Sequence, residues 1–520
     1  MLFQKILIIH RRQKKSDGFS QKGLFMKKRV ILTVFASFCA TQLLAKIDMG
    51  TPFSDHAVLQ RGMKLPVWGT AAAGNDVSVN FAGQKVYSKV GADGKWRIDL
   101  FPLEASAVSR KMIVTEYAPN GGAAVDMVEV NDVVVGEVWL ASGQSNMECP
   151  IWGSNPRYRD ANGGLMVAST FMNNIRFAAV EHKWSVEPVA QKTPWRRFNP
   201  KELTSARQVS AVGFYFAREI YLALGGVPVG IVSANWGGTN IDAWTPRSGY
   251  EGCDPSIKAV ADYEVKKNWN PKTDATKPIS RAHQQPTVLW NGMVSAWAPM
   301  ASRGFIWYQG CHNNGESELY AAKMHALYNG WAKEFENPGF KLYFVQLAPY
   351  NQNWPGIVKA QNKFAAEQKN AAIAVTADVG NFSDIHPNNK EIVGRRLAVH
   401  ALKNDYGFDI PETDSPVFKK VEFDGAKAKV YFDNAKSFYI YANNRSVEPA
   451  FELAGKNGAW MKAKVLNVKD NGVIKGDYIE LTCDKIKNPV KVRYMIKAYT
   501  MGTVYNEASL PLGPFESESK

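Results

Sequence analysis

Two hydrophobic patterns alternate through the middle of the chain, between about residues 131 and 410. Short, continuous apolar runs are typical of strands that are buried on both faces of a parallel sheet. Longer stretches with apolar residues every three or four positions are typical of helices that cover such a sheet. The expected strands are residues 133–140, 175–180, 229–233, 304–308, 342–347 and 372–377, and the expected helices are residues 211–224, 319–335, 358–369 and 390–403. The pattern therefore predicts an α/β domain.

A different pattern, strict alternation of apolar and polar residues, flanks this region on both sides and predicts strands with one buried face. Before it, runs at 77–81 and 96–100 lie on either side of a turn at Asp93-Gly94, which predicts a hairpin. After it, runs at 421–423, 429–432 and 478–481 predict a β-sandwich. The expected folded parts are an N-terminal β domain at 46–130, the α/β domain at 131–410 and a C-terminal β-sandwich domain at 411–520.

Residues 1–45 are interpreted as a segment that is removed from the mature protein. Three basic residues after Met26, an apolar run at 30–40 and the small residue Ala45 have the order of a secretory signal. The apolar run is too short to span a membrane as a helix. We expect a start at Met26, cleavage after Ala45 and a periplasmic or secreted product, with residues 1–25 as an upstream extension. Anchoring through Cys39 is a weaker alternative, because Phe38 stands where a lipid-attachment signal has a small residue.

The net charge of the mature protein is much smaller than that of the whole chain, because residues 1–45 are strongly basic. The 520 residues are 45% hydrophobic and 21% charged, as in a globular protein, with a formal net charge of +15. Residues 1–45 contain nine basic residues and one acidic residue, so about +7 is left, and this excess is spread along the chain. We therefore expect no nucleic-acid partner. The remaining cysteines fit no common zinc spacing, and the sequence does not define a disulfide pairing among Cys149, Cys253, Cys311 and Cys483.

Candidate catalytic residues follow the predicted strands, at the edge of the sheet where ligands bind in open α/β folds. Ser145 lies in the turn after the first strand. After the third strand, the pair Gly237-Gly238 could present a backbone N–H to an oxyanion. Because a serine hydroxyl needs a base to act as a nucleophile at neutral pH, His386, after the last strand, is the candidate base.

Three short blocks together resemble the sialate O-acetylesterase family, a branch of the SGNH hydrolases. They are Gly-Gln-Ser-Asn-Met at 143–147, Trp-Tyr-Gln-Gly at 307–310 with Asn313 beyond it, and Asp-Ile-His-Pro at 384–387. Segments near both ends are similar to this family as well, and His56, in the first of them, is expected to be structural. The resemblance implies a flavodoxin-like, three-layer α/β/α esterase domain with a parallel sheet, flanked by N- and C-terminal β domains.

The resemblance also implies catalytic roles. Ser145 would be the nucleophile and His386 the base. Asp384 is favoured as the residue that orients His386, and Asp378 is its competitor. The oxyanion hole would consist of the N–H groups of Ser145 and of Gly238 or Gly237, together with the side-chain amide of Asn313.

The substrate-binding candidates are Gln144, Trp236 and Gln309. Cys311 and His312 depart from the family pattern, which has Glu followed by a small polar residue or Asn. These two departures leave the support of the site and the substrate preference open.

These inferences predict a carbohydrate O-acetylesterase acting on O-acetylated sialic acid, with no metal or cofactor and no stable insertion into a membrane. An acetylxylan or pectin esterase is the nearest alternative, because the same framework serves acetylated plant polysaccharides. The pocket would depend on loops such as 151–170 and 250–290, which the pattern does not place. An alternative of another class is a non-catalytic glycan-binding protein on an esterase scaffold, with Cys311 and His312 as signs of lost activity.

Overall fold

The structure is a computed structural model that describes residues 46–153, 155, 158–164, 172–205, 209–268, 281–352, 354–441, 450–469, 471–496 and 500–517. The predicted signal segment and Cys39 lie outside these residues. Within the described ranges, no helix combines the length and the apolar character needed to cross a membrane.

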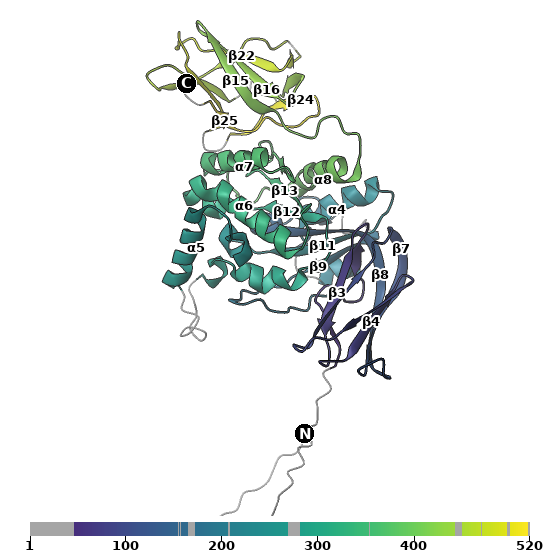
Figure 1. Cartoon of the computed structure of the whole chain (residues 1–520). Helices are drawn as coiled ribbons and strands as arrows, with labels where there is room; N and C mark the ends of the chain where they lie inside the picture. The colour runs from purple at the N-terminus through teal and green to yellow at the C-terminus, as the bar shows by residue number, and fades with distance from the viewer. Residues whose placement is uncertain are drawn as a thin grey trace, which may run out of the picture. The chain divides into compact units, whose positions relative to one another are not determined.

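A parallel sheet lies in the middle of the chain (Figure 1), and all six predicted strands belong to it. The strand order is β9-β11-β8-β12-β13-β14, with β10 added antiparallel at the β9 edge. The first predicted strand is therefore central, and its residues from Val133 to Gly143 are buried as the apolar run predicts. The bounds are β8 Ala124–Gly143, β9 Met172–Ala179, β10 Arg196–Phe198, β11 Val229–Asn235, β12 Gly304–Tyr308, β13 Lys341–Val345 and β14 Ala371–Ala374.

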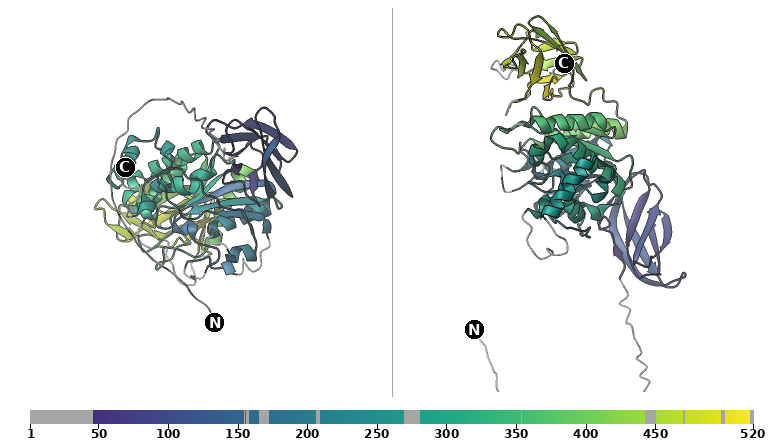
Figure 2. Two further views of the ribbon diagram at one scale, coloured as in Figure 1. Left: turned by 90° about the horizontal axis from the view of Figure 1, so that it is seen from below. Right: turned by 60° about the vertical axis from the view of Figure 1, so that its left-hand side comes forward.

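Helices cover both faces of this sheet (Figures 1 and 2). Trp139 of β8 packs its ring 5.0 Å from that of Phe216 in α4. Phe305 of β12 lies opposite Leu140, the next residue along β8, and its ring is 4.5 Å from that of Trp331 in α6. Since successive residues of a strand point to opposite faces, α4 and α6 lie on opposite sides of the sheet.

The four predicted helices are confirmed, with ends that shift by a few residues. They are α4 Ala211–Ala223, α6 Ser317–Glu334, α7 Pro355–Glu367 and α8 Lys390–Tyr406. The helical elements that the pattern did not predict are α1 Ser145–Glu148, α3 Pro200–Ser205, α5 Pro255–Asn268, η1 Ile241–Trp244, η2 Arg247–Gly249, η3 Ala282–Gln284, η4 Trp290–Val294, η5 Ser295–Trp297 and η6 Cys311–Glu316.

The N-terminal β region is continuous with the central sheet, because the first half of β8 pairs with its strands. The predicted hairpin around Asp93-Gly94 is wrong: the turn exists, but the strand after it pairs with β3 in a separate sheet of order β1-β3-β6. Both runs point into the same core, so alternation alone could not tell which partner each strand takes. The bounds are β1 Asp48–Met49, β2 Val58–Gln60, β3 Leu65–Thr70, β4 Asp76–Phe81, β5 Gln84–Lys89, β6 Lys95–Leu100 and β7 Ser106–Tyr117.

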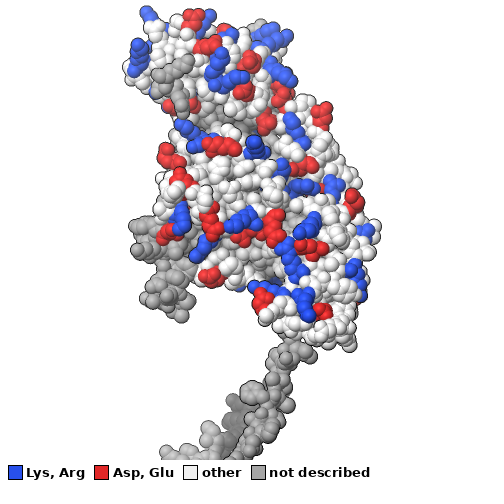
Figure 3. Space-filling model, viewed as in Figure 1, with Lys and Arg blue, Asp and Glu red and all other residues white. Residues whose placement is uncertain are grey.

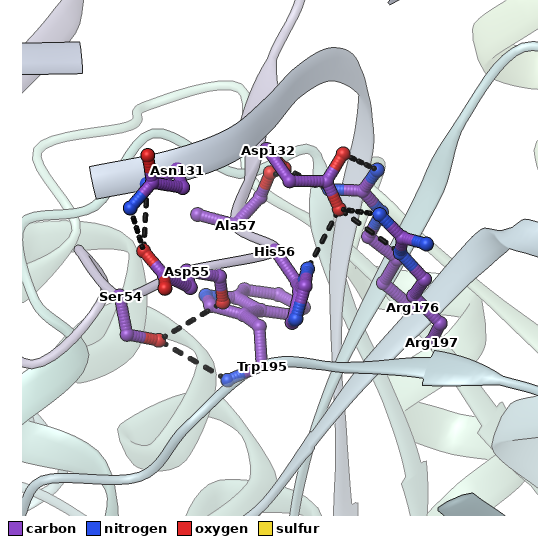
Figure 4. Close-up of polar contacts among 9 residues, drawn as sticks. All are labelled: Ser54, Asp55, His56, Ala57, Asn131, Asp132, Arg176, Trp195 and Arg197. Atoms are coloured by element: carbon purple, nitrogen blue, oxygen red, sulfur yellow. Dashed lines mark hydrogen bonds and ion pairs between the residues drawn. The ribbon is translucent and has the colours of Figure 1, made fainter. Parts of the chain in front are cut away.

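His56 joins the N-terminal segment to β8 (Figure 4). Its Nδ1 lies 2.7 Å from Oδ2 of Asp132, a residue of β8 with a left-handed φ of 55°. The same carboxylate accepts hydrogen bonds from Arg176 of β9 at 3.1 Å and from Arg197 of β10 at 2.7 Å. One carboxylate thus holds three segments together, a structural arrangement that agrees with the role expected for His56.

In the C-terminal region, the regular elements of the described residues are β-strands, as its alternation predicts. Its strands form three small sheets, β15-β16-β22-β20, β21-β17-β24 and β19-β18-β23-β25. They share a core that includes Val430, Phe438, Leu453 and Val492. The bounds are β15 Val417–Asp424, β16 Lys427–Asp433, β17 Ser437–Ile440, β18 Phe451–Ala454, β19 Trp460–Lys462, β20 Lys464–Val465, β21 Val473–Lys475, β22 Tyr478–Thr482, β23 Lys491–Tyr494, β24 Val504–Asn506 and β25 Phe515–Glu516.

Candidate active site

Ser145 lies just beyond the carboxyl end of the central strand β8, where α1 begins. The turn that leads to it is tight. Gly143 has a φ of +138°, and a Cβ on it would lie 2.3 Å from the carbonyl oxygen of Tyr308 in β12. Only glycine fits in this conformation and this space. Gly143 therefore lets the end of β8 pass close to β12. The chain then turns into α1 at Ser145, which is half-buried.

His386 reaches Ser145 from the loop between β14 and α8. Its Nε2 lies 2.8 Å from Oγ of Ser145, although the two residues are 241 positions apart. This is the distance at which an imidazole can take the proton of a serine hydroxyl. The structure thus brings together the two residues that the sequence proposed as nucleophile and base.

Of the two candidate orienting acids, Asp384 is the one beside His386. Its Oδ1 lies 3.3 Å from Nδ1 of His386 and also accepts the backbone N–H of His386 at 2.8 Å. Asp378 instead accepts two hydrogen bonds from the guanidinium of Arg396, at 2.7 and 2.8 Å. This geometry supports Asp384 over Asp378.

The surroundings of His386 favour its neutral form. Burial lowers the pKa of the imidazole from its ordinary value of 6.5, and the nearby charge of Lys390 lowers it further. Asp384 and Glu148 act in the opposite direction without reversing the shift. A histidine that is neutral at physiological pH can accept the serine proton.

The proposed oxyanion donors differ in whether their N–H groups already make hydrogen bonds. The Gly237 N–H donates a hydrogen bond to Oε2 of Glu148 at 2.7 Å, so it is already engaged. Gly238 is exposed and has a left-handed φ of 71°. The Asn313 side chain is buried, and its Nδ2 donates to Glu316 at 2.9 Å. An amide nitrogen carries two hydrogens, so a second donor remains on Asn313.

Ser145 and His386 open onto a cleft of about 400 Å³. Glu148 and Tyr158 also line it. The Tyr158 hydroxyl donates to the backbone carbonyl of Ser145 at 2.7 Å, and its ring packs edge-on 4.9 Å from that of His386. Tyr158 comes from the loop 151–170, one of the two segments that we expected to build the pocket.

Two of the substrate-binding candidates are buried and have partners inside the protein. Oε1 of Gln144 accepts the N–H of Gly310 at 3.1 Å. Nε2 of Gln309 donates to the Thr239 carbonyl and to Asn313 Oδ1, while its Oε1 accepts the Tyr320 hydroxyl at 2.7 Å. These bonds tie the loops around the cleft to one another, and a role for either glutamine in substrate binding stays a prediction.

Trp236 stacks with two histidines. The centre of the His182 ring lies 4.2 Å and that of the His283 ring 5.1 Å from that of Trp236, and both rings are nearly parallel to the indole. A sugar that stacks on a tryptophan needs a free ring face. His182 and His283 already cover part of the indole of Trp236, and its role in substrate binding stays a prediction.

Several residues at the site were missed by the sequence reasoning. Glu148 accepts the backbone N–H of Gly237, and its Oε1 lies 3.0 Å from Nε2 of His182. Asn146 and Lys390 form hydrogen bonds beside Ser145 and His386. Glu148 and Asn146 lie within three residues of Ser145, so their polar character after an apolar strand was an available signal. Lys390 of α8 binds Asn146 of α1. Because the two residues are far apart in the sequence, no local sequence pattern indicates this contact.

Among the described residues, no group of three or more His, Cys, Asp or Glu side chains could hold a metal ion. Cys149, Cys253, Cys311 and Cys483 are free thiols. On the face shown in Figure 3, basic and acidic side chains of the described residues are interspersed.

Comparison with known proteins identifies the family. The family model for "Carbohydrate esterase, sialic acid-specific acetylesterase" matches residues 135–403, just over half of the chain. The chain is therefore a carbohydrate esterase. It belongs to the family of carbohydrate esterases described as sialic acid-specific acetylesterases, which the sequence blocks had indicated.

Individual relatives support the same assignment. The chain is 28% identical over 404 residues to the rat protein named sialate O-acetylesterase, covering 68% of this chain and 73% of that protein. It is 26% identical over 387 residues to the human protein of that name, covering 68% and 70%. A crystal structure of a carbohydrate acetylesterase from Xanthomonas citri aligns with a TM-score of 0.75 and 29% identity, covering 91% of this chain and all of that one.

Proposed function

We propose that the protein is a serine O-acetylesterase that releases acetate from O-acetylated sialic acids. The observation that carries this proposal is the 2.8 Å distance between Oγ of Ser145 and Nε2 of His386 at the floor of an open cleft. Asp384, beside Nδ1 of the same histidine, completes a Ser-His-Asp arrangement.

The geometry suggests the following reaction. Ser145 Oγ attacks the acetyl carbonyl carbon while Nε2 of His386 accepts its proton, and Asp384 stabilises the imidazolium that results. When the tetrahedral intermediate collapses, the bond to the sugar oxygen breaks and His386 protonates that oxygen. Water, deprotonated by His386, then attacks the acetyl group on Ser145, and acetate leaves as the serine takes its proton back.

The negative charge on the tetrahedral intermediate needs hydrogen-bond donors. We assign the N–H groups of Ser145 and Gly238 and the second hydrogen of Asn313 Nδ2. Gly237 is a weaker candidate, because its N–H already donates to Glu148. Each well-placed donor contributes about 3 kcal/mol to stabilising such a transition state.

The substrate class rests on the comparisons. The family description names sialic acid, and the rat and human relatives are called sialate O-acetylesterase. The Xanthomonas citri protein is described only as a carbohydrate acetylesterase, without a named sugar. Because that description leaves the sugar open, acetylated xylan, the alternative given in the sequence analysis, is the second substrate to test.

We also propose that the esterase domain at 131–410 has the SGNH arrangement, that β domains at 46–130 and 411–520 flank it, and that the protein is exported. The strand order and the position of Ser145 after the central strand support the first part. The resemblance of residues 26–45 to a signal peptide supports the last.

The test is acetate release from 9-O-acetylated sialic acid and from acetylated xylan, measured side by side with the wild type and Ser145→Ala. Ser383→Ala is the matched control, because Ser383 is an exposed serine three residues before His386. Release from sialate that only Ser145→Ala abolishes supports the proposal. Acetate release from xylan alone would indicate that acetylated xylan, and not sialic acid, is the substrate. Glycan binding without acetate release from any ester would indicate a binding protein.

A further inference from the structure

The side chain of Asn146, the residue after the proposed nucleophile, contacts the chain on both sides of His386. Nδ2 of Asn146 donates to the carbonyl oxygen of Ile385 at 3.0 Å. Its Oδ1 accepts a hydrogen bond from Nζ of Lys390 at 2.5 Å. Ile385 precedes His386 and Lys390 follows it by four residues. One amide therefore holds this loop against the turn that carries Ser145.

The chemistry of the two partners explains why an amide lies here. A peptide carbonyl only accepts hydrogen bonds, and a lysine amine that is protonated only donates them. The Asn146 amide offers one group of each kind, so both contacts are satisfied at once. A carboxylate at this position could still bind Lys390 but would oppose the Ile385 carbonyl with a second acceptor.

Lys390 is an unusual residue to find in this place. Its side chain is 1% exposed, and its Nζ lies 5.4 Å from the centre of the Tyr308 ring. Its own backbone N–H donates to Asp160 at 3.1 Å, which fixes the start of α8. A lysine is almost never fully buried unless a partner holds it, and the hydrogen-bond partner that the structure shows for its amine is Asn146.

The amine is close enough to act on His386 electrostatically. Burial lowers the pKa of Lys390 itself, and its neighbours Cys149, Asp160, Cys311 and Asp384 act against that effect. After burial, Lys390 is the main influence that lowers the pKa of His386; Asp384 and Glu148 oppose it. Among the described residues, these are the charged groups with the largest effects on the pKa of the histidine.

We infer that Asn146 and Lys390 are a buried positioning pair that holds His386 against Ser145. Neither side chain lines the cleft, so they act through the catalytic residues and not on the substrate. This inference rests on the proposed esterase function, because it assigns the pair to that reaction.

The test uses Asn146→Asp and Lys390→Met in the full protein, with Lys403→Met as the matched control. Lys403 lies on the same helix thirteen residues further on, about 20 Å along its axis. The readouts are kcat and KM with an activated acetyl ester, the pH profile of kcat/KM, the melting temperature and an NMR titration of the His386 ring.

For Asn146→Asp we expect kcat to fall about 10- to 100-fold with little change in KM, because the misplaced histidine affects the transition state and not substrate binding. For Lys390→Met we expect the acid limb of kcat/KM and the NMR titration of His386 to move to higher pH, because a charge that disfavours imidazolium is gone. Lys403→Met should match the wild type in both.

Unchanged kcat in Asn146→Asp together with an unmoved His386 titration in Lys390→Met would overturn the inference. A lower melting temperature without either change would show that the pair supports only the fold, which also overturns it. If the wild type hydrolyses no ester, the proposed function fails, and the NMR titration still decides whether Lys390 acts on His386.

Discussion

The carboxylate of Glu148 and the backbone N–H of Gly237 are joined by a hydrogen bond of 2.7 Å across the proposed active site. Gly237 also lies beside the turn that carries Ser145, since a Cβ on it would lie 3.2 Å from Cβ of Ser145. The other oxygen of Glu148 lies 3.0 Å from His182, which stacks on Trp236. Glu148 thus couples α1 to the glycine loop after β11.

Replacing Glu148 tests the effect of its charge on His386. Burial and Lys390 lower the pKa of His386, and Glu148 opposes them, so Glu148→Gln should lower that pKa further. The acid limb of kcat/KM should move to lower pH, opposite to the shift expected for Lys390→Met. A pH profile measures it, with Glu422→Gln in the C-terminal region as control. An acid limb of kcat/KM that does not move would show that the charge of Glu148 has no effect on the pKa of His386.

The wild-type pH profile is itself a prediction. His386 must be neutral to accept the Ser145 proton, and its pKa is lowered by burial and by Lys390. Activity should therefore fall only as the pH drops below the ordinary histidine value of 6.5. An unperturbed histidine would place the midpoint of this limb near 6.5. A profile of kcat/KM from about pH 4 to 8 distinguishes the two, and a midpoint at or above 6.5 contradicts the structure.

Asp384 and Asp378 can be separated by matched substitutions. Asp384→Asn should lower kcat about 10- to 100-fold at nearly native melting temperature, because His386 loses the group that orients it. Asp378→Asn should instead lower the melting temperature, because it removes the charged partner of the buried Arg396. A large loss of kcat in Asp378→Asn alone would transfer the orienting role to Asp378.

Asn313 provides a test of the oxyanion hole. Asn313→Asp removes both amide hydrogens and places an acceptor near the developing negative charge, so kcat should fall about 100- to 1000-fold. Asn314→Asp, a change at the exposed neighbouring residue, is the control. Steady-state kinetics and a melting curve are needed together, because Asn313 also binds Glu316. If kcat stays within about threefold of the wild type, the third donor lies elsewhere.

The fold was largely predictable because buried positions are apolar and recur along the sequence with the period of a strand or a helix. Each continuous apolar run became a strand of the central sheet, and Ser145 and His386 follow two of these strands. Strand pairing was less predictable, since the run at 96–100 is compatible with either sheet of the N-terminal region. The environment of Trp236 was not predictable, because His182 and His283 come from distant segments. Lys390 resembles any first residue of a helix, and only the tertiary structure shows that its amine is buried.

The last prediction concerns stability at the joint between β8 and the N-terminal segment (Figure 4). Burial alone would raise the pKa of Asp132, but hydrogen bonds from His56 and Arg197 outweigh it and hold that pKa well below its usual range. A carboxylate with a depressed pKa stabilises the folded state above its unfolded pKa of about 4, and this stabilisation is lost as the pH falls through the folded value. Breaking a fully buried ion pair typically costs about 3 to 5 kcal/mol, and the cost here is smaller because the His56 and Arg197 side chains are each 40% exposed. Asp132→Asn should therefore lower the melting temperature by several degrees at pH 7, and the difference from the wild type should shrink in acid. Asp93→Asn, in an exposed turn, is the control. A difference that stays constant as the pH falls would show that shape, and not charge, is what Asp132 contributes.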